Sequence, residues 1–387
     1  MAVILFILSG LFFLLAQHPF VTYPLSLRVL RRWRRQPILP AGETAENIAL
    51  LVCAYNEEAI IAEKAENMLA LKRVFPQLEM FIYVDGAIDR TAEILERYKK
   101  RIHVLATPRR RGKTYGMNQL VSLTKASILI FTDANVMFDV ESFRHLIPYF
   151  ADGLVGCVCG HLQYTNTKET VTAANGSLYW RLEERIKQLE SDTGSVMGAD
   201  GSVFAIRREL HRPPPASIVD DMFVSLNILC DGYRIVRAPD VLAYEASVTS
   251  PHEEFARKAR IACMAYNAHR LLWPRLRRLS ALNLYKYISH KWLRWLTIYW
   301  LALSAMFFEG GMIYSDMGTE GAAIMVLGSI ALATGKILRI PPAPQLADIL
   351  MAFLGAGLGV FRSIRGERLP IWAPAASIRN SIRIAQG

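Results

Sequence analysis

The chain has 387 residues, a formal net charge of +11 and a mean hydropathy of +0.21. This length leaves room for one sizeable α/β domain together with membrane segments. The apolar residues collect toward the two ends of the chain, which indicates an anchored domain and argues against a freely soluble enzyme. The basic excess lies largely beside those apolar segments, which favours attraction to membrane lipids over nucleic-acid binding. The cysteines form no CxxC pair, and no His/Cys cluster has the spacing of a zinc site.

Residues 1–30 are predicted to form an N-terminal transmembrane anchor. The run from Ala2 to Ala16 carries no charge, and its extension through Leu27 provides the roughly 20 residues that a bilayer crossing needs. A cleaved signal peptide is the alternative, but no basic residue precedes the run and no small-residue cleavage site follows it. Residues 31–46 are predicted to be a basic linker. Its arginines place the next domain on the cytoplasmic side of the inner (plasma) membrane.

Residues 47–275 are predicted to form this cytoplasmic domain, because short apolar runs alternate with segments of helical spacing. Such alternation is typical of a doubly wound α/β fold, in which a parallel sheet has helices on both faces. The expected strands cover residues 48–54, 80–84, 102–106, 128–132 and 155–159, and the expected helices cover 59–71, 89–98, 175–191 and a segment beginning near Val219.

Residues 276–364 are predicted to hold interfacial and transmembrane helices, followed by a tail over residues 365–387. The region opens with an aromatic border typical of a membrane interface, and apolar segments follow at 298–308, 322–338 and 346–361. Arginines after residue 361 predict a cytoplasmic tail, whereas four crossings from an outside N-terminus predict the opposite side. Either one segment is re-entrant or interfacial, with residues 346–361, which contain Asp348, as the best candidate, or the charge rule does not hold for this chain.

Acidic side chains follow three of the predicted strands. Glu57 lies just after the first strand, Asp85 and Asp89 follow the second, and Asp133 follows the strand over 128–132. Ligands of doubly wound sheets bind beyond the carboxyl ends of the strands. Helix capping is the alternative for any single acidic residue, and it is the preferred interpretation for Asp89. Three acidic strand ends on one rim predict a binding site.

These stretches, taken in order, resemble family-2 glycosyltransferases of the membrane-bound bacterial exopolysaccharide synthase type, such as poly-N-acetylglucosamine synthase. The motifs are AYNEE (54–58), DGxxDxT (85–91), GKxxxxN (112–118), TDAN (132–135), GADG (198–201), VDD (219–221), RKAR (257–260) and WAP (372–374). The resemblance implies a nucleotide-sugar-binding domain and inverting transfer of a hexosyl unit from a UDP-sugar to a polysaccharide or lipid-linked saccharide. Partner subunits of a polysaccharide export system are a further expectation.

The resemblance assigns four residues of the first motifs to the nucleotide. Tyr55 and Glu57 are expected to line the nucleoside pocket, and Asp85 to accept the imide hydrogen of uracil in a charge-assisted bond. Lys113 is expected to place a cation near the phosphates. The sequence around Lys113 also suggests a phosphate-binding loop, but Thr107 stands where that motif requires its leading glycine.

The diphosphate leaving group is expected to bind Mg²⁺ or Mn²⁺ as cofactor, with Asp133 as a ligand because hard cations take oxygen donors. Asn135 stands where the family has its second aspartate; an amide oxygen can ligate a metal but brings no charge. Arg260 is expected to clamp the pyrophosphate; an interfacial, membrane-facing role for Arg257 and Arg260 is the alternative. The resemblance places Asp200 and Arg257 beside the acceptor.

Asp221 is the candidate general base that takes the proton of the attacking acceptor hydroxyl. Asp220 stands beside it, where many relatives have glutamate. Two acids stabilised by the dipole of a helix N-terminus are the alternative interpretation. Many processive relatives carry QxxRW where this chain has Arg257 and Ile261, which weakens the case for processive polymerisation. A non-processive lipid glycosyltransferase and a non-enzymatic basic membrane-binding protein therefore remain alternatives.

Overall fold

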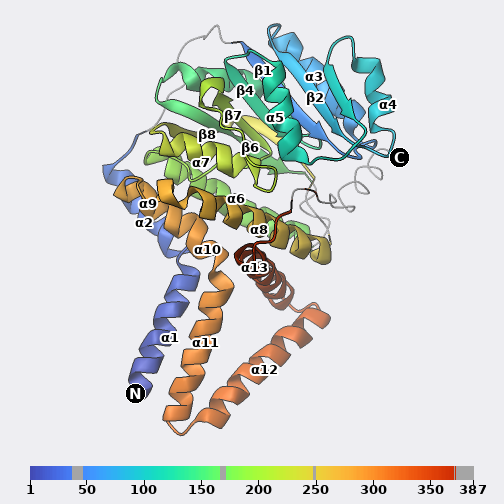
Figure 1. Ribbon diagram of the computed structural model, residues 1–387. Helices are drawn as coiled ribbons and strands as arrows, with labels where there is room; N and C mark the ends of the chain where they lie inside the picture. Colours follow the sequence, from blue (N-terminus) through green and yellow to red (C-terminus); the bar gives the residue numbers. More distant parts are fainter. Residues whose placement is uncertain (37–46, 166–170, 247–249, 370, 372–387) are drawn as a thin grey trace.

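The computed structural model describes residues 1–36, 47–165, 171–246, 250–369 and 371. Its centre is an eight-stranded sheet with the order β3-β2-β1-β4-β7-β6-β8-β5 (Figure 1). The strands are β1 (Ile48–Ala54), β2 (Glu79–Asp85), β3 (His103–Thr107), β4 (Ile128–Asp133), β5 (Met137–Phe138), β6 (Val155–Tyr164), β7 (Val203–Arg207) and β8 (Arg234–Glu245). The five strands predicted from the sequence correspond to β1, β2, β3, β4 and β6.

The sheet is mixed, which corrects the prediction of a parallel doubly wound sheet. Strands β3, β2, β1 and β4 are parallel, as expected. Strand β7 then runs antiparallel to both β4 and β6, and β5 runs antiparallel to β8. Of the strands in this half that were not predicted, β5 has only two residues, and Pro239 and Asp240 interrupt the apolar pattern of β8.

Helices cover both faces of the sheet, as predicted. They are α3 (Ile61–Val74), α4 (Thr91–Leu95), α5 (Lys113–Leu123), α6 (Val171–Asp192), α7 (Asp220–Cys230) and α8 (Pro251–Leu276), with short 3₁₀ turns η1 to η4 between them. Alternate residues of β1 enter two different cores: Leu50 and Val52 pack with α3, whereas Ala49 and Leu51 pack with α5 and α7. Burial on both faces explains why β1 reads as a continuous apolar run.

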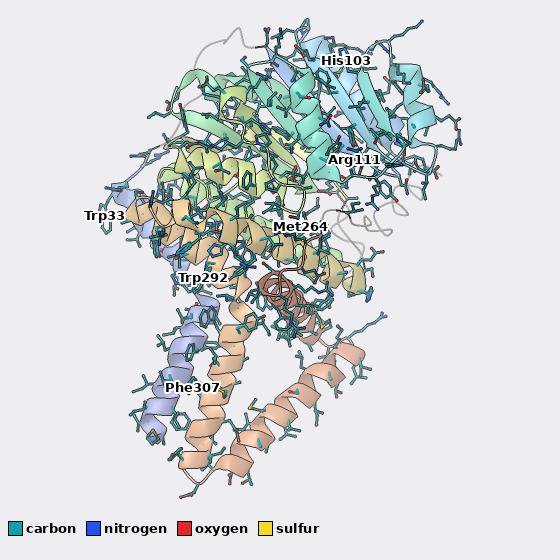
Figure 2. The ribbon with its side chains drawn as sticks, viewed as in Figure 1. Trp33, His103, Arg111, Met264, Trp292 and Phe307 are labelled. Atoms are coloured by element: carbon teal, nitrogen blue, oxygen red, sulfur yellow. The ribbon has the colours of Figure 1, made fainter. Side chains whose placement is uncertain are left out.

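The remaining helices extend away from the sheet. They are α1 (Ala2–Gln17), α2 (Thr22–Trp33), α9 (Ala281–Tyr287), the π-helical turn η5 (Ile288–Trp292), α10 (Leu293–Trp295), α11 (Thr297–Tyr314), α12 (Gly318–Ile337) and α13 (Ala343–Ile364). Figure 1 shows α1, α11 and α12 projecting from one side of the domain. Phe307, labelled in Figure 2, lies on α11 and stacks on Phe12 of α1 with ring centroids 5.4 Å apart.

Among the described residues, α12 and α13 are each long and apolar enough to cross a membrane. The pair α1–α2 and the pair formed by α9–α10 with α11 meet the same criteria of length and apolar composition only when each bent pair is counted together, with bends of 65° and 70°. The N-terminal segment is therefore not one straight helix through Leu27. Instead, Tyr23 and Leu27 turn inward and pack against Ile186 and Leu189 of α6. The transmembrane anchor itself stays a prediction.

Helix α13, expected not to span, packs along α8 beneath the domain (Figure 1). Its glycines allow a close approach, because a Cβ at Gly359 would collide with the Ala259 carbonyl oxygen of α8. The WAP motif at 372–374 and most of the predicted linker, residues 37–46, lie outside the described residues.

Candidate active site

A pocket with a volume of about 710 Å³ lies where β1, β2 and β4 end, between the sheet and the helices α6, α7 and α8. Met264 of α8 lines it, and the labels for Met264 and Arg111 in Figure 2 mark this region. Every site residue predicted from the sequence lines this pocket: Tyr55, Glu57, Asp85, Lys113, Asp133, Asn135, Asp200, Asp220, Asp221, Arg257 and Arg260.

Asp85 is buried and bonded to the protein's own backbone. Its two carboxylate oxygens accept the N–H groups of Arg111 and Gly112 at 2.7 and 2.8 Å. These bonds hold down the loop before α5, and the Arg110 guanidinium of that loop lies 3.5 Å from the centre of the Tyr55 ring. Each carboxylate oxygen has a second lone pair. The predicted contact between Asp85 and uracil stays a prediction, since both oxygens already position this loop.

Asp89 has a structural role at the turn just before α4, whose N-cap is Arg90. Its Oδ1 accepts the N–H of Thr91 at 3.0 Å at the start of α4, and its Oδ2 accepts the N–H of Glu58 at 3.0 Å. The Thr91 hydroxyl also accepts the N–H of Glu57 at 2.7 Å. The DGxxDxT and AYNEE motifs are thus joined by hydrogen bonds, which keeps the β1 and β2 ends of the pocket together.

Lys113 is the cation at the centre of the acidic rim. Its Nζ lies 2.6 Å from Asp133 Oδ1 and 3.8 Å from Asp220 Oδ2. Burial by itself lowers the pKa of Lys113, but Asp133, Asp220 and Asp221 together raise it above its ordinary value. The GK, TDAN and VDD motifs therefore meet around one ammonium group.

Asp221 lies in the first turn of α7, close to that ammonium. Burial, followed by the negative charge of Asp220, raises the pKa of Asp221 to about 7, while Lys113 acts in the opposite direction. Gly201 of the GADG loop leaves space beside it, because a Cβ at Gly201 would lie 3.1 Å from Asp221 Oδ2. A pocket carboxyl that titrates near neutral pH has the property required of a general base.

Asp200 is engaged by a lysine that sequence reasoning did not identify. Lys187 of α6 lies 2.5 Å from Asp200 Oδ2 and 2.9 Å from Glu184 Oε1. Although burial opposes it, the Lys187 charge lowers the pKa of Asp200. Lys187 also lies 4.5 Å from the Trp180 ring, and both residues line the pocket. Asp200 is thus ion-paired with Lys187, and its predicted role in binding the acceptor stays a prediction.

The two predicted arginines of α8 also differ in their surroundings. Arg257 forms an ion pair with Glu254 at 2.9 Å. Burial, followed by repulsion from Arg257, lowers the pKa of Arg260 to about 10. A bound anion would favour the charged form of Arg260, and the predicted phosphate contact of this residue stays a prediction.

The oxygen donors at the end of β4 are suited to a divalent cation bound together with phosphates. The Asp133 side chain is 36% exposed, and Asn135 Nδ2 donates to Glu245 Oε1 at 2.9 Å. Burial and the Asp133 charge raise the pKa of Glu245 to about 7. Within the described ranges no group of three or more His, Cys, Asp or Glu is placed to hold a metal. Mg²⁺ typically uses one or two carboxylates and takes its other ligands from substrate phosphates and water.

Two residues beneath this turn were missed by the sequence analysis. Lys64 of α3 is fully buried and donates to the Val136 carbonyl, and burial lowers its pKa to about 7. Asn67, one turn later, donates to the Phe138 carbonyl at 2.9 Å and accepts the Phe138 N–H at 3.1 Å. The sequence could have indicated them, because Lys64 and Asn67 are polar residues on the inward face of the predicted helix α3. They fix the backbone that follows Asp133 and Asn135.

Comparisons with known proteins bear on the family and the fold of this chain. Residues 49–212 match the protein-family model described as glycosyl transferase family 2. A β-monoglucosyldiacylglycerol synthase of Nostoc sp. is 29% identical over 167 residues, which are 42% of this chain and 36% of that protein. A poly-β-1,6-N-acetyl-D-glucosamine synthase of Staphylococcus epidermidis is 22% identical over 52% of this chain and 50% of that protein. The chain thus spans half or less of the length of these relatives.

A solved structure has the same overall fold. A mannosyltransferase of Pyrobaculum calidifontis, in complex with GDP-mannose and Mn²⁺, superimposes with a TM-score of 0.73 at 18% identity. The match covers 94% of this chain and 100% of that one. It therefore includes the helices outside the sheet as well as the domain.

Proposed function

The chain carries a family-2 glycosyltransferase domain, as its motifs predicted, and on that premise we propose that it transfers a hexosyl unit from a UDP-sugar to an acceptor hydroxyl at a membrane, with inversion. The acceptor is a polysaccharide or a lipid-linked saccharide. One observation carries the proposal: Asp221, whose pKa is raised to about 7, shares a pocket with the ion pair between Lys113 and Asp133. This supports a proton acceptor, Asp221, working beside a phosphate site at Lys113.

The donor occupies the side of the pocket formed by the strand ends. Tyr55 and Asp85 line the part that takes the nucleoside, and Lys113 and Arg260 supply cations for the two phosphates. A divalent cation held by Asp133 would neutralise charge on the departing diphosphate. The solved mannosyltransferase with the same fold binds its nucleotide sugar together with Mn²⁺, which supports the need for a metal.

The acceptor approaches from the side of α6 and α8. Asp221 takes the proton of its hydroxyl as that oxygen attacks the anomeric carbon, and the bond from this carbon to the diphosphate oxygen breaks. Because attack and departure occur on opposite faces of the sugar, one displacement inverts the configuration. Asp220 and Lys113 set the protonation of Asp221 through their charges.

The apolar helices support action at the inner membrane. Helices α12 and α13 are long enough to span, and α1 and α11 pack together beside them. With the domain on the cytoplasmic face, a multi-pass chain of this kind takes a soluble sugar donor from one side and an acceptor from the bilayer. Membrane lipids, and subunits of an export system for a polysaccharide product, are the corresponding partners.

A single transfer to a glycolipid is the second candidate. Ile261 lines the pocket where many processive relatives have tryptophan, so an aromatic surface for a growing chain is missing at this point. The match to a β-monoglucosyldiacylglycerol synthase also favours a lipid acceptor. Product length separates the two candidates, since a glycolipid synthase adds one sugar and a polymerase adds many.

The decisive experiment is a transfer assay with the full chain in nanodiscs, supplied with UDP-sugars or GDP-sugars and with Mn²⁺ or Mg²⁺. We expect UDP release together with a product of increased mass. Asp221→Asn should keep donor binding but reduce turnover by about two to four orders of magnitude, the scale of general-base catalysis. Asp152→Asn, at an exposed turn where the side chain accepts the Leu154 N–H, is the matched control.

Near-normal turnover in Asp221→Asn would remove the base assignment. Release of GDP and not UDP would overturn the proposed donor. No transfer with any nucleotide sugar, in membranes that supply lipid and saccharide acceptors, would overturn the function.

A further inference from the structure

We propose that Glu245, the last residue of β8, supplies the second carboxylate of the divalent-cation site, in place of the charge that the TDAN turn lacks at Asn135. This inference rests on the proposed function, because the cation is the one that accompanies the nucleotide diphosphate. It assigns Asn135 a different task from the ligand role expected from the sequence. Asn135 is a positioning residue that directs the Glu245 carboxylate into the pocket.

Sheet register brings these residues together although they are 110 positions apart. Strand β5 pairs with the end of β8, with Met137 opposite Tyr244. The turn that holds Asn135 therefore lies beside the last residue of β8. On its other side Glu245 pairs with Tyr164 of β6, and its carbonyl accepts the Thr165 N–H at 3.0 Å. The β6 pairing of Glu245, together with the β5 pairing of its neighbour Tyr244, fixes the position from which the Glu245 side chain extends.

The direction of the Asn135 amide supports a positioning role. Its Nδ2 donates to Glu245 Oε1 at 2.9 Å, and an amide nitrogen is not a ligand for a hard cation. An aspartate at position 135 could not make this bond, because an ionised carboxylate only accepts hydrogen bonds. Asn135 and Glu245 are therefore chemically complementary. The uncharged Asn135 amide donates the hydrogen bond that orients the Glu245 carboxylate.

The charge balance of the pocket also favours a cation here. Asp133 and Glu245 both line it, and their like charges repel. Lys113 contacts Asp133, and Arg257, the α8 cation whose charge acts on Glu245, is paired with Glu254 at 2.9 Å. Two carboxylates and two phosphates form the kind of oxygen-rich set in which Mg²⁺ and Mn²⁺ bind. With Glu245 the site has the same number of carboxylates as the family's two-aspartate motif.

The test measures Mn²⁺ binding to the full chain in nanodiscs saturated with UDP, from the electron paramagnetic resonance signal of free Mn²⁺. Glu245→Gln keeps an oxygen that accepts from Asn135 but removes the charge. We expect a loss of Mn²⁺ affinity of about tenfold or more, at least the loss seen when a partner of a metal ligand is removed. Asn135→Asp added to Glu245→Gln returns a carboxylate to the turn and should recover most of that loss.

Glu79→Gln is the matched control. Glu79 is also a strand glutamate that accepts one side-chain hydrogen bond, from Thr124 at 2.7 Å, but it lies at the start of β2, away from the pocket. Mn²⁺ affinity should be that of the wild type. Thermal unfolding of each variant, compared with the wild type, reports whether the fold is intact.

An unchanged Mn²⁺ affinity in Glu245→Gln, or a loss that Asn135→Asp does not recover, would overturn the inference. A wild-type protein that binds no Mn²⁺ in the presence of UDP would overturn it as well. Sugar transfer by the wild type is measured separately. If the wild type transfers sugar and Glu245→Gln keeps the wild-type Mn²⁺ affinity, only the role of Glu245 is rejected. If the wild type transfers sugar from no donor, the proposed function is rejected.

Discussion

The Lys113 ammonium lies 2.6 Å from the Asp133 carboxylate, so the residue that begins α5 neutralises the residue that ends β4. The same ammonium is 3.8 Å from Asp220 in α7. Three segments of the chain thus meet at one cation. A bound diphosphate would compete with these carboxylates for Lys113, which links donor binding to the protonation of Asp221.

Removal of this cation is expected to weaken donor binding and to shift the pH dependence. Lys113→Met loses a charge-assisted contact with phosphate worth about 1.5–3 kcal/mol, which raises the Kd for UDP roughly tenfold to a hundredfold. Because Lys113 lowers the pKa of Asp221, the acidic limb of the kcat/KM profile should also move to higher pH. Calorimetry with UDP and pH-rate profiles check the two effects. Lys113→Arg, which keeps the charge, should be affected less; equal UDP affinity in Lys113→Met and wild type would contradict this role.

The second prediction concerns the wild-type pH profile. A base must be deprotonated, and the pKa of Asp221 is raised to about 7, so kcat/KM should rise with pH up to about 7 and then level off. Burial is the first cause of this shift and the charge of Asp220 is the second. Asp220→Asn should therefore move the limb to lower pH. If the acidic limb of Asp220→Asn stays at the wild-type pH or moves to higher pH, Asp220 does not raise the pKa of the base.

The third prediction concerns the glycine that lets the loop before α5 close on Asp85. Gly86 has φ of +60°, and a Cβ there would lie 2.6 Å from the backbone nitrogen of Arg110. Gly86→Ala should therefore lower stability by about 1–3 kcal/mol and reduce UDP affinity, because backbone cannot move aside cheaply. Thermal unfolding and UDP titration measure both. Gly153→Ala, with no atom within 4 Å of the added Cβ, is the control and should leave both unchanged.

The fourth prediction concerns the buried network that joins α2 to the domain. Glu190 of α6 is fully buried and accepts hydrogen bonds from Tyr23 at 2.5 Å and from His290 at 2.7 Å, both also buried. Glu190→Gln removes the charge that accepts these two bonds and leaves the Met197 N–H without its acceptor oxygen, so it should cost about 3 kcal/mol or more. Tyr23→Phe removes one bond to a charged group and should cost about 1.5–3 kcal/mol.

Thermal unfolding of the detergent-solubilised chain tests this order. Tyr285→Phe is the control, since its hydroxyl bonds Ser26 at the surface, and it should change stability by less than about 0.5 kcal/mol. A Glu190→Gln protein as stable as the wild type would show that the network does not hold α2 to α6.

The sequence by itself determined those strands and motifs that depend only on residues close together in the chain. Apolar runs identified β1, β2 and β4 because strands buried on both faces carry a continuous signal. The motifs at the ends of these strands identified residues that share one pocket, because parallel strands direct their carboxyl ends to the same edge. Asp89 has the structural role preferred from the sequence, but as a turn residue before the N-cap Arg90, bonded to the Thr91 N–H.

Only the tertiary structure decided the rest, because it depends on pairing between distant segments. The antiparallel direction of β7 follows from its position between β4 and β6. The bend before α2 follows from the packing of Tyr23 on α6. Glu245 reaches Asn135 through the register of β5 on β8, and a carboxylate placed by register leaves no local motif in the sequence.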